Sequence, residues 1–312
     1  MHDTGEIVKL RPQRNLVNAD MPYHFLQEQE PGPSGAIQRV NTIFLTGKEC
    51  AFKCLMCDLW KNTLTGPTPA GAIPKQIDYA LARLPEADVI KLYNSSNFFD
   101  QKAVPPADYA AIIERLQPYG RVIVENHPKL CDEACLEFKD QLNGTLEIAM
   151  GLESIHPAVL PKLNKQMTAE DFSRAAKFLR SNWIDVRAFI LLNPPYLTDK
   201  AENIRSVQKA VEFAFENGVQ CCSIIPTRPG NGVMELLQAE GHYVPPTLEA
   251  LEDVFDNALG LNGGRVFVDT WDIAFLADCL VCFEARKNRL NAMNMDQKIH
   301  PRIVCTCTVN DA

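Results

Sequence analysis

The chain has 312 residues, of which 46% are hydrophobic and 22% are charged, and its formal net charge is −8. This composition is typical of a globular protein with a large core and excludes a disordered chain. The acidic charge gives no overall field that would attract nucleic acid, although a local basic patch is compatible with it. Residues 1–20 lack the apolar core of a signal peptide, and no run has the length of a membrane span, so we expect a cytoplasmic protein.

Three segments follow one another along the chain. Residues 1–36 are polar and rich in proline, and we interpret them as an extended N-terminal lead-in. Residues 37–262 are expected to form the core domain. Residues 263–312 are expected to form a C-terminal strand and a cysteine-rich extension.

The first chemical motif is Cys50, Cys54 and Cys57, spaced C-x3-C-x2-C just after the strand-like run 40–46. Three thiolates are one fewer than a closed tetrahedral metal site uses, so one metal position is left open. A C-x2-C pair is also found as half of a zinc site or as a redox pair. A structural zinc site would need a fourth ligand, and the nearest candidate, Asp58, is a poor substitute for a thiolate.

After this loop, short apolar runs alternate with longer stretches of helical period. The predicted strands are Val89–Asn94, Arg121–Glu125, Thr145–Met150, Val186–Leu192, Gln220–Ile225 and Arg265–Asp269. The predicted helices are Lys75–Leu84, Pro106–Gln117, Asp132–Gln141, Ala169–Ser181, Lys200–Asn217 and Thr247–Leu259. Such alternation predicts an α/β fold with parallel strands, either an open sheet or a barrel. In both architectures ligands gather at the C-terminal ends of the strands.

The cysteine motif resembles that of the radical S-adenosylmethionine (radical SAM) superfamily. The resemblance implies a partial (β/α)6 TIM-like barrel in which Cys50, Cys54 and Cys57 hold three irons of a [4Fe-4S] cluster. It further implies that SAM binds the fourth iron and that an electron, from a donor such as flavodoxin or ferredoxin, cleaves SAM to a 5'-deoxyadenosyl radical. The residue before the third cysteine is often aromatic in the superfamily and is Met56 here, whose thioether can pack over adenine.

The resemblance also indicates where SAM binds. The loop after the second strand, often Gly-Gly-Glu in the superfamily, holds Asn94, Ser95 and Ser96 here, which offer side-chain and backbone acceptors. Glu153 and Ser154, in Gly151-Leu-Glu-Ser, match a sequence that reaches the SAM ribose or methionine. Glu153 is alternatively an acid at a helix N-terminus.

Arg187, early in a strand, shares one face of it with Phe189 and Leu191. If it points into the barrel it needs a carboxylate partner, either Glu153 or that of SAM. It is alternatively an outward, solvent-facing residue. No catalytic residue is assigned from the sequence, and His127 is equally a turn residue.

Residues 151–195 narrow the resemblance to the branch that contains the archaeosine-biosynthesis and other tRNA-modifying radical SAM proteins. This likeness makes a tRNA nucleoside a candidate substrate. The acidic charge favours a small metabolite or a peptide. A third hypothesis is a non-catalytic zinc or iron-sulfur protein that serves as an interaction surface.

A second group of cysteines lies near the C-terminus. Cys279 and Cys282 form a C-x2-C pair, and Cys305 and Cys307 form a C-x-C pair. Four thiolates in two pairs can close a site for zinc or for a second iron-sulfur cluster, or the cysteines are packed or free thiols. A helix is expected over 283–295, with Arg286, Lys287 and Arg289 on a solvated face or binding phosphate. Cys131 and Cys135 share a helix face, where core packing is the preferred interpretation over metal binding.

Overall fold

The computed structural model describes residues 3–305, and within them one sheet contains eight strands in chain order. The strands are β1 (His24–Pro31), β2 (Ile37–Phe44), β3 (Val89–Tyr93), β4 (Arg121–Glu125), β5 (Thr145–Glu153), β6 (Asp185–Leu192), β7 (Cys221–Pro226) and β8 (Arg265–Val268). β1 is antiparallel to β2, and all later neighbours are parallel. The sheet therefore forms the partial TIM-like barrel that the sequence predicts.

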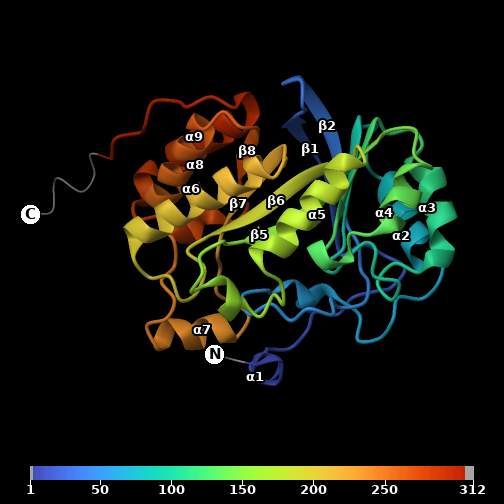
Figure 1. Cartoon of the computed structure of the whole chain (residues 1–312), viewed down its shortest axis with the longest axis horizontal. Helices are drawn as coiled ribbons and strands as arrows, with labels where there is room; N and C mark the ends of the chain where they lie inside the picture. The colour runs from blue at the N-terminus through green and yellow to red at the C-terminus, as the bar shows by residue number, and fades with distance from the viewer. Residues whose placement is uncertain (1–2, 306–312) are drawn as a thin grey trace, which may run out of the picture.

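Helices cover the outer face of the sheet (Figure 1). The helices of the described residues are α1 (Thr4–Lys9), α2 (Ala72–Leu81), α3 (Tyr109–Leu116), α4 (Glu133–Lys139), α5 (Ala169–Ser181), α6 (Lys200–Glu216), α7 (Val233–Ala239), α8 (Leu248–Gly260) and α9 (Leu280–Asp296), and all but α1 and α7 lie on this face. Short 3-10 helices are η1 (Leu59–Asn62), η2 (Pro106–Asp108), η3 (Pro128–Leu130), η4 (Leu160–Leu163) and η5 (Ile273–Leu276). In Figure 1, α2, α3 and α4 lie at the right of the view, α6, α8 and α9 lie at the left, and α5 lies between the two groups.

The helix α5 shows how local sequence fixes these elements. Thr168 accepts a hydrogen bond from the Asp171 backbone and the Asp171 side chain accepts one from Thr168, which forms a capping box. Phe172, Ala176 and Leu179 recur at helical spacing and are fully buried. They belong to the main core, which fills the layer between the sheet and its helices.

A buried ionic network closes the end of the barrel where the parallel strands begin. Glu30 accepts from Lys91 at 2.6 Å, and Glu147 accepts from Arg187 at 2.7 Å and from Arg265 at 3.3 Å. Arg187 also pairs with Glu30. Buried charges persist in a protein interior when they are paired in this way. The opposite end, where the parallel strands finish, is left for ligands, and we call it the barrel mouth.

Side-chain amides cover the free edge of β8. Asn294 donates to the Val268 carbonyl and accepts from its N–H, both at 2.9 Å, and Gln297 binds the backbone of Val266 at 2.8 and 2.9 Å. Each amide thus satisfies the groups that a further strand would bind, and this keeps the edge from pairing with another chain.

Residues 1–36 were predicted to be an extended lead-in, but within them the structure contains the helix α1 and the strand β1. β1 escapes a pattern search because its inward residues are Glu28 and Glu30, which serve the ionic network rather than an apolar core. α7 is also absent from the sequence prediction. The strand expected after residue 262 is β8, which joins the same sheet as the core domain.

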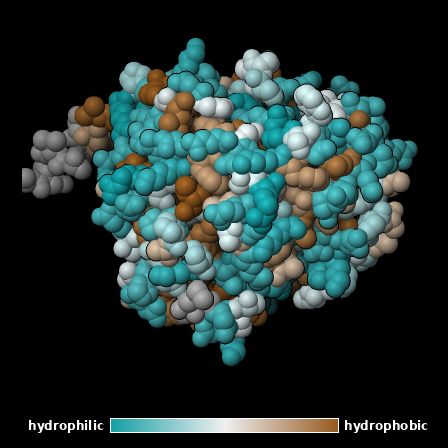
Figure 2. Space-filling model, in the orientation of Figure 1, coloured by the Kyte–Doolittle hydropathy of each residue, from teal (hydrophilic) through white to brown (hydrophobic). Residues whose placement is uncertain are grey.

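The surface shown in Figure 2 is mainly hydrophilic, with scattered apolar residues. Within residues 3–305, no helix is both long enough and apolar enough to cross a lipid bilayer.

Candidate metal centre and cofactor site

Cys50, Cys54 and Cys57 lie in the loop between β2 and η1, at the barrel mouth. All three are half-buried and none is in a disulfide. The three sulfur atoms do not all lie within 4.8 Å of one another. Among the described residues, the sulfur atoms of Cys279, Cys282 and Cys305 do lie that close. A single ion would need close sulfurs, whereas a multi-iron cluster gives each thiolate its own iron. The loop therefore fits a cluster better than one ion.

Hydrogen bonds fix this loop from the barrel side. Nδ2 of Asn97, in the loop after β3, donates to Sγ of Cys50 at 3.2 Å. The Leu55 N–H donates to the Leu163 carbonyl at 2.8 Å, and Nδ2 of Asn164 donates to the Lys53 carbonyl at 2.7 Å. Residues after β3 and around η4 thus hold the three cysteines in place.

The loop is also held from the side of α1 and α7. Asn231, buried between β7 and α7, donates to the carbonyls of Leu55 at 2.8 Å and Cys57 at 3.3 Å. Leu55 packs in a separate apolar cluster with Ile7, Val233, Met234, Leu237 and Tyr243. In Figure 1, α1 and α7 accordingly lie together at the mouth end of the molecule.

His127 supports the loop by stacking. Its ring lies on Phe52, inside the cysteine motif, with centroids 3.6 Å apart and an interplanar angle of 11°. Its Nε2 lies 3.1 Å from the Lys165 carbonyl. Burial, together with the charge of Lys165, lowers the pKa of His127 to about 3. The ring is therefore neutral, and its turn position before Pro128 has a packing role that the sequence does not reveal.

The cysteine environment opposes free thiolates. Burial raises the pKa of Cys54 to about 12, and the Lys165 ammonium offsets only part of this shift. The pKa of Cys50 is raised by the same cause and lowered in part by the Asn97 hydrogen bond. Since thiolates are the metal-binding form, positively charged metal is what would keep these sulfurs deprotonated.

Glu153 ends β5 beside the cysteine loop, at a bulge in the pairing with β6. Its backbone has φ 63°, a conformation that non-glycine residues rarely adopt, and its Oε1 accepts from Nζ of Lys165 at 2.7 Å. Both side chains are buried. Glu153 is thus a strand-end carboxylate and not a helix N-terminal acid, with one oxygen paired to Lys165. The Ser154 hydroxyl accepts from the His156 N–H at 3.1 Å.

The loop after β3 holds the residues predicted to contact SAM. Ser95 donates to the Tyr23 hydroxyl at 3.0 Å, and Asn94 Oδ1 accepts from the Ser96 N–H at 3.3 Å. Nδ2 of Asn94 and Oγ of Ser96 are buried without a hydrogen-bond partner among the described residues. Unpaired buried polar groups are costly, so this loop has spare capacity for a polar ligand.

Arg187 is placed differently from its prediction. Its guanidinium binds Glu30 and Glu147 in the ionic network at the closed end of the barrel. The expectation that it pairs with Glu153 is wrong, because Glu153 pairs with Lys165. Arg187 does point into the barrel. Its carboxylate partners are Glu30 on β1 and Glu147 on β5, in place of Glu153 or the carboxylate of SAM.

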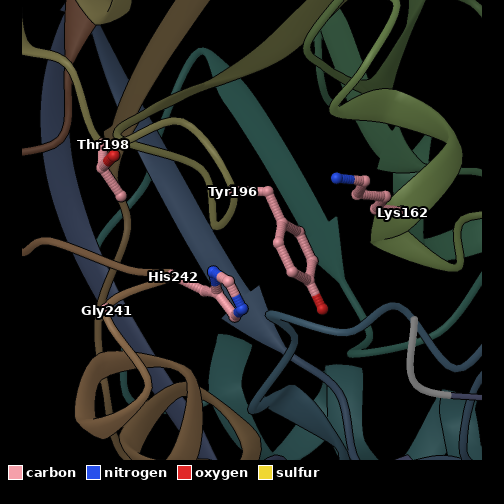
Figure 3. Close-up of a pocket in the computed structure, with 5 residues that line it drawn as sticks. All are labelled: Lys162, Tyr196, Thr198, Gly241 and His242. Carbon is pink, nitrogen blue, oxygen red and sulfur yellow. The ribbon is translucent and has the colours of Figure 1, made fainter.

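A cavity of about 300 Å³ opens near the cysteine loop and is lined by Lys162, Tyr196, Thr198, Gly241 and His242. Figure 3 shows the Tyr196 ring between His242 and Lys162. The ring centroids of Tyr196 and His242 are 5.6 Å apart, and Nζ of Lys162 lies 4.8 Å from the centroid of the Tyr196 ring. Aromatic rings and one cation thus line the cavity.

The C-terminal cysteines converge in part. The ligand atoms of Cys279, Cys282 and Cys305 lie within 4.8 Å of one another, while Cys307 lies outside the described residues. Arg286 and Arg289 are buried on α9 and bind Glu252 at 2.7 Å and Asp256 at 2.7 Å respectively. They are structural ion pairs, so the solvated or phosphate-binding cluster expected there is wrong for these two residues. Cys131 and Cys135 pack in the main core, as the sequence indicates.

Sequence reasoning missed Lys165, Asn231 and Tyr23. Lys165 lies within residues 151–195, which carry the narrower resemblance, and Asn231 follows a Pro-Gly turn after a predicted strand, so each lies close to a sequence feature that points to the site. Tyr23 lies before β1, which the sequence pattern did not predict.

The partial barrel is the fold that the resemblance to the radical SAM superfamily implies, and the predicted resemblance is confirmed at the level of the fold. Two solved structures share this fold. Elp3 of Methanocaldococcus infernus matches with a TM-score of 0.52 and 15% identity, over 72% of this chain and 59% of that chain. SuiB of Streptococcus suis, bound to S-adenosylmethionine, matches with a TM-score of 0.53 and 10% identity, over 72% of this chain and 48% of that chain.

Two sequence relatives are similar over most of the chain. An uncharacterized protein of Methanocaldococcus jannaschii is 26% identical over 293 residues, which is 85% of this chain and 79% of the relative. The archaeosine synthase subunit beta of Methanosarcina acetivorans is 26% identical over 219 residues, 66% of this chain and 61% of that subunit. No family model matches the chain.

Proposed function

We propose that this protein is a radical SAM enzyme whose [4Fe-4S] cluster is held by Cys50, Cys54 and Cys57. The observation that carries the proposal is the open three-thiol loop at the mouth of a partial barrel. Asn97, in the loop after the neighbouring strand β3, donates a hydrogen bond to Sγ of Cys50 in this three-thiol loop. A structural metal site would close the set with a fourth ligand. The fold shared with SuiB in its S-adenosylmethionine complex supports the same conclusion.

The residues around the loop fit the cofactors. When bound, the reduced cluster would cleave S-adenosylmethionine to a 5'-deoxyadenosyl radical that takes hydrogen from a substrate. Asn97 donates to a cluster sulfur, and the unpaired Asn94 Nδ2 and Ser96 Oγ would bind polar groups of SAM. Glu153, fixed by Lys165, would accept from the ribose hydroxyls through its second oxygen.

The chain also limits water inside the barrel. The ionic network closes the far end of the barrel, and Tyr93 and Phe189 line its interior with Val40, Ile123 and Ala149. An apolar interior of this kind keeps a reactive intermediate from side reactions with solvent. The substrate would enter at the mouth, and an external one-electron donor such as flavodoxin or ferredoxin would supply the cluster.

A nucleoside in tRNA is the substrate class that we favour. Trp271, just after β8, is 53% exposed and stacks on Phe44 with centroids 6.0 Å apart and an interplanar angle of 25°. Arg228 binds the Trp271 carbonyl and, at 2.7 Å, Asp269. Trp271 thus presents an exposed aromatic ring on which an unpaired base can stack. The likeness to archaeosine synthase subunit beta supports this class.

SAM cleavage tests the proposed activity. We expect the anaerobically reconstituted protein, reduced with dithionite, to convert SAM to 5'-deoxyadenosine, measured by chromatography. The variant with Cys50→Ala, Cys54→Ala and Cys57→Ala should form none. Equal product from both proteins, or none from either after full iron incorporation, would contradict the proposal.

A matched pair of tryptophans tests the substrate class. Trp271 lies at the mouth, whereas Trp183 is 81% exposed just before β6, at the closed end of the barrel. We expect Trp271→Ala to weaken binding of an unmodified tRNA transcript by about tenfold, the loss of one stacked base, and Trp183→Ala to leave it unchanged. Equal effects of the two changes would contradict the platform, without bearing on SAM cleavage.

A further inference from the structure

Three thiols from distant parts of the C-terminal region meet at the start of α9. Cys279 is the N-cap residue of α9, Cys282 lies in its first turn, and Cys305 lies beyond its far end. Their ligand atoms are nevertheless within 4.8 Å of one another. Cys282 is buried, and Cys279 and Cys305 are half-buried. The trio lies outside the site proposed for SAM.

The chain after α9 is held in the path that brings Cys305 back. Gln297, with φ 56°, ends the helix in the left-handed conformation that reverses chain direction. Arg289 then donates to the carbonyls of His300 at 2.7 Å and Pro301 at 3.1 Å. Arg302 pairs with Asp253 at 2.6 Å and Asp256 at 2.8 Å, both on α8. In Figure 1 the red segment after α9 accordingly turns back over this helix.

We propose that Cys279, Cys282 and Cys305 bind a single zinc ion. Zinc–sulfur bonds of about 2.3 Å in a tetrahedron place sulfur atoms about 3.8 Å apart, which the described trio can meet with little movement. A second iron-sulfur cluster would attach each thiolate to its own iron and spread the sulfurs, as in the Cys50 loop. The N-terminus of α9 supports the choice, because its free N–H groups favour negative thiolates.

The ion would fix one wall of the barrel mouth. The segment from Asp269 to Cys279 contains Trp271 and η5 and connects β8 to α9. Its end is anchored at Cys279, so a metal that joins Cys279 to Cys305 ties this wall to the returning chain and, through Arg302, to α8. The zinc is thus structural and independent of the cluster and of SAM.

Zinc content tests the proposal without reference to activity. The parent protein is the full chain carrying Cys50→Ala, Cys54→Ala and Cys57→Ala, which removes the other thiol site. We expect about one zinc per chain by elemental mass spectrometry, and a loss of about tenfold or more on adding Cys279→Ser or Cys305→Ser. Cys131→Ser, a half-buried thiol on the opposite side of the sheet, should retain the zinc.

Absence of zinc from the parent, or equal zinc in all variants, would overturn the site. Alkylation of the unsubstituted protein tests the site without relying on variants that fail to fold. Cys279 and Cys305 should be protected from iodoacetamide until a chelator is added, and then react at least about tenfold faster. Equal rates with and without chelator, or a Cys279–Cys282 disulfide in the freshly purified protein, would contradict the proposal.

Discussion

The side-chain amide of Asn97 donates a hydrogen bond to Sγ of Cys50 at 3.2 Å. This contact joins the loop after β3 to the loop after β2, which are neighbouring parallel strands. Hydrogen bonds to cluster sulfurs stabilise the more negative, reduced state and raise the reduction potential. Asn97 is therefore placed to tune the proposed cluster and does not need to contact substrate.

Removal of this donor should lower the potential. We expect Asn97→Ala to shift the midpoint of the reconstituted cluster to a more negative value in a redox titration followed by electron paramagnetic resonance (EPR). The matched control is Ser95→Ala. Ser95 lies in the same loop as Asn97 but bonds to the Tyr23 hydroxyl, so its loss should leave the midpoint unchanged. An unchanged midpoint in Asn97→Ala would show that the contact is structural only.

Gly151 makes room for the Glu153–Lys165 pair. A Cβ at position 151 would lie 2.1 Å from Oε1 of Glu153 and 2.5 Å from Nζ of Lys165. Gly151→Ala should therefore separate a buried ion pair and lower the free energy of unfolding by about 3 kcal/mol, measured by chemical denaturation. Gly66→Ala, where a Cβ meets nothing within 4 Å, should change it by less than about 1 kcal/mol. Similar effects of both substitutions would contradict the packing argument.

Glu147 is the central acid of the ionic network. Burial disfavours its charge, but Arg187, Arg265 and Arg121 overcome this and hold its pKa below the usual range. Glu147→Gln removes one of the two carboxylates that the buried arginines share with Glu30, so we expect a loss of about 3 kcal/mol in the free energy of unfolding. Asp88→Asn, which breaks an exposed pair with Arg39, should cost less than about 1 kcal/mol. A network with no net role would give two equally small losses.

Glu125, at the mouth end of β4, predicts a pH dependence. Burial raises its pKa from 4.5 to about 7, partly offset by the Asn94 N–H. Because the folded-state pKa lies above the unfolded value, its contribution to stability is fully present below about pH 4.5 and is lost as pH rises through about 7. Glu125→Gln should remove this loss and be more stable than the unsubstituted protein at pH 8 by about 2 kcal/mol. A stability difference that does not change between pH 5 and pH 8 would contradict the shift.

The parallel strands and their helices were predictable because their residues show regular burial. α5 occupies the predicted range Ala169–Ser181, and its buried residues recur at helical spacing. β1 was not predictable, because Glu28 and Glu30 point into the barrel toward Lys91 and give an inward face that looks solvent-exposed in sequence. The partner of an inward charge is set by three-dimensional pairing, which no local pattern encodes.

The site shows the same division. The three cysteines are close together in sequence, so their spacing alone predicts them as one group of ligands. Arg187 could not be placed, because alternation fixes which face of a strand a residue lies on and not which end of the barrel its partners occupy. Asn231 and Lys165 act through contacts that join distant loops, as in the Asn231 bond to the Leu55 carbonyl at 2.8 Å.

The central claim is that the Cys50 loop holds a cluster with one iron open to SAM. The most direct test is the EPR spectrum of the reduced, reconstituted protein with and without SAM, in a Cys279→Ser and Cys282→Ser background that removes the second thiol site. We predict a cluster signal that SAM changes, and no signal when Cys50, Cys54 and Cys57 are alanine. A signal that SAM leaves unchanged, or one that survives the three alanine substitutions, would contradict the account.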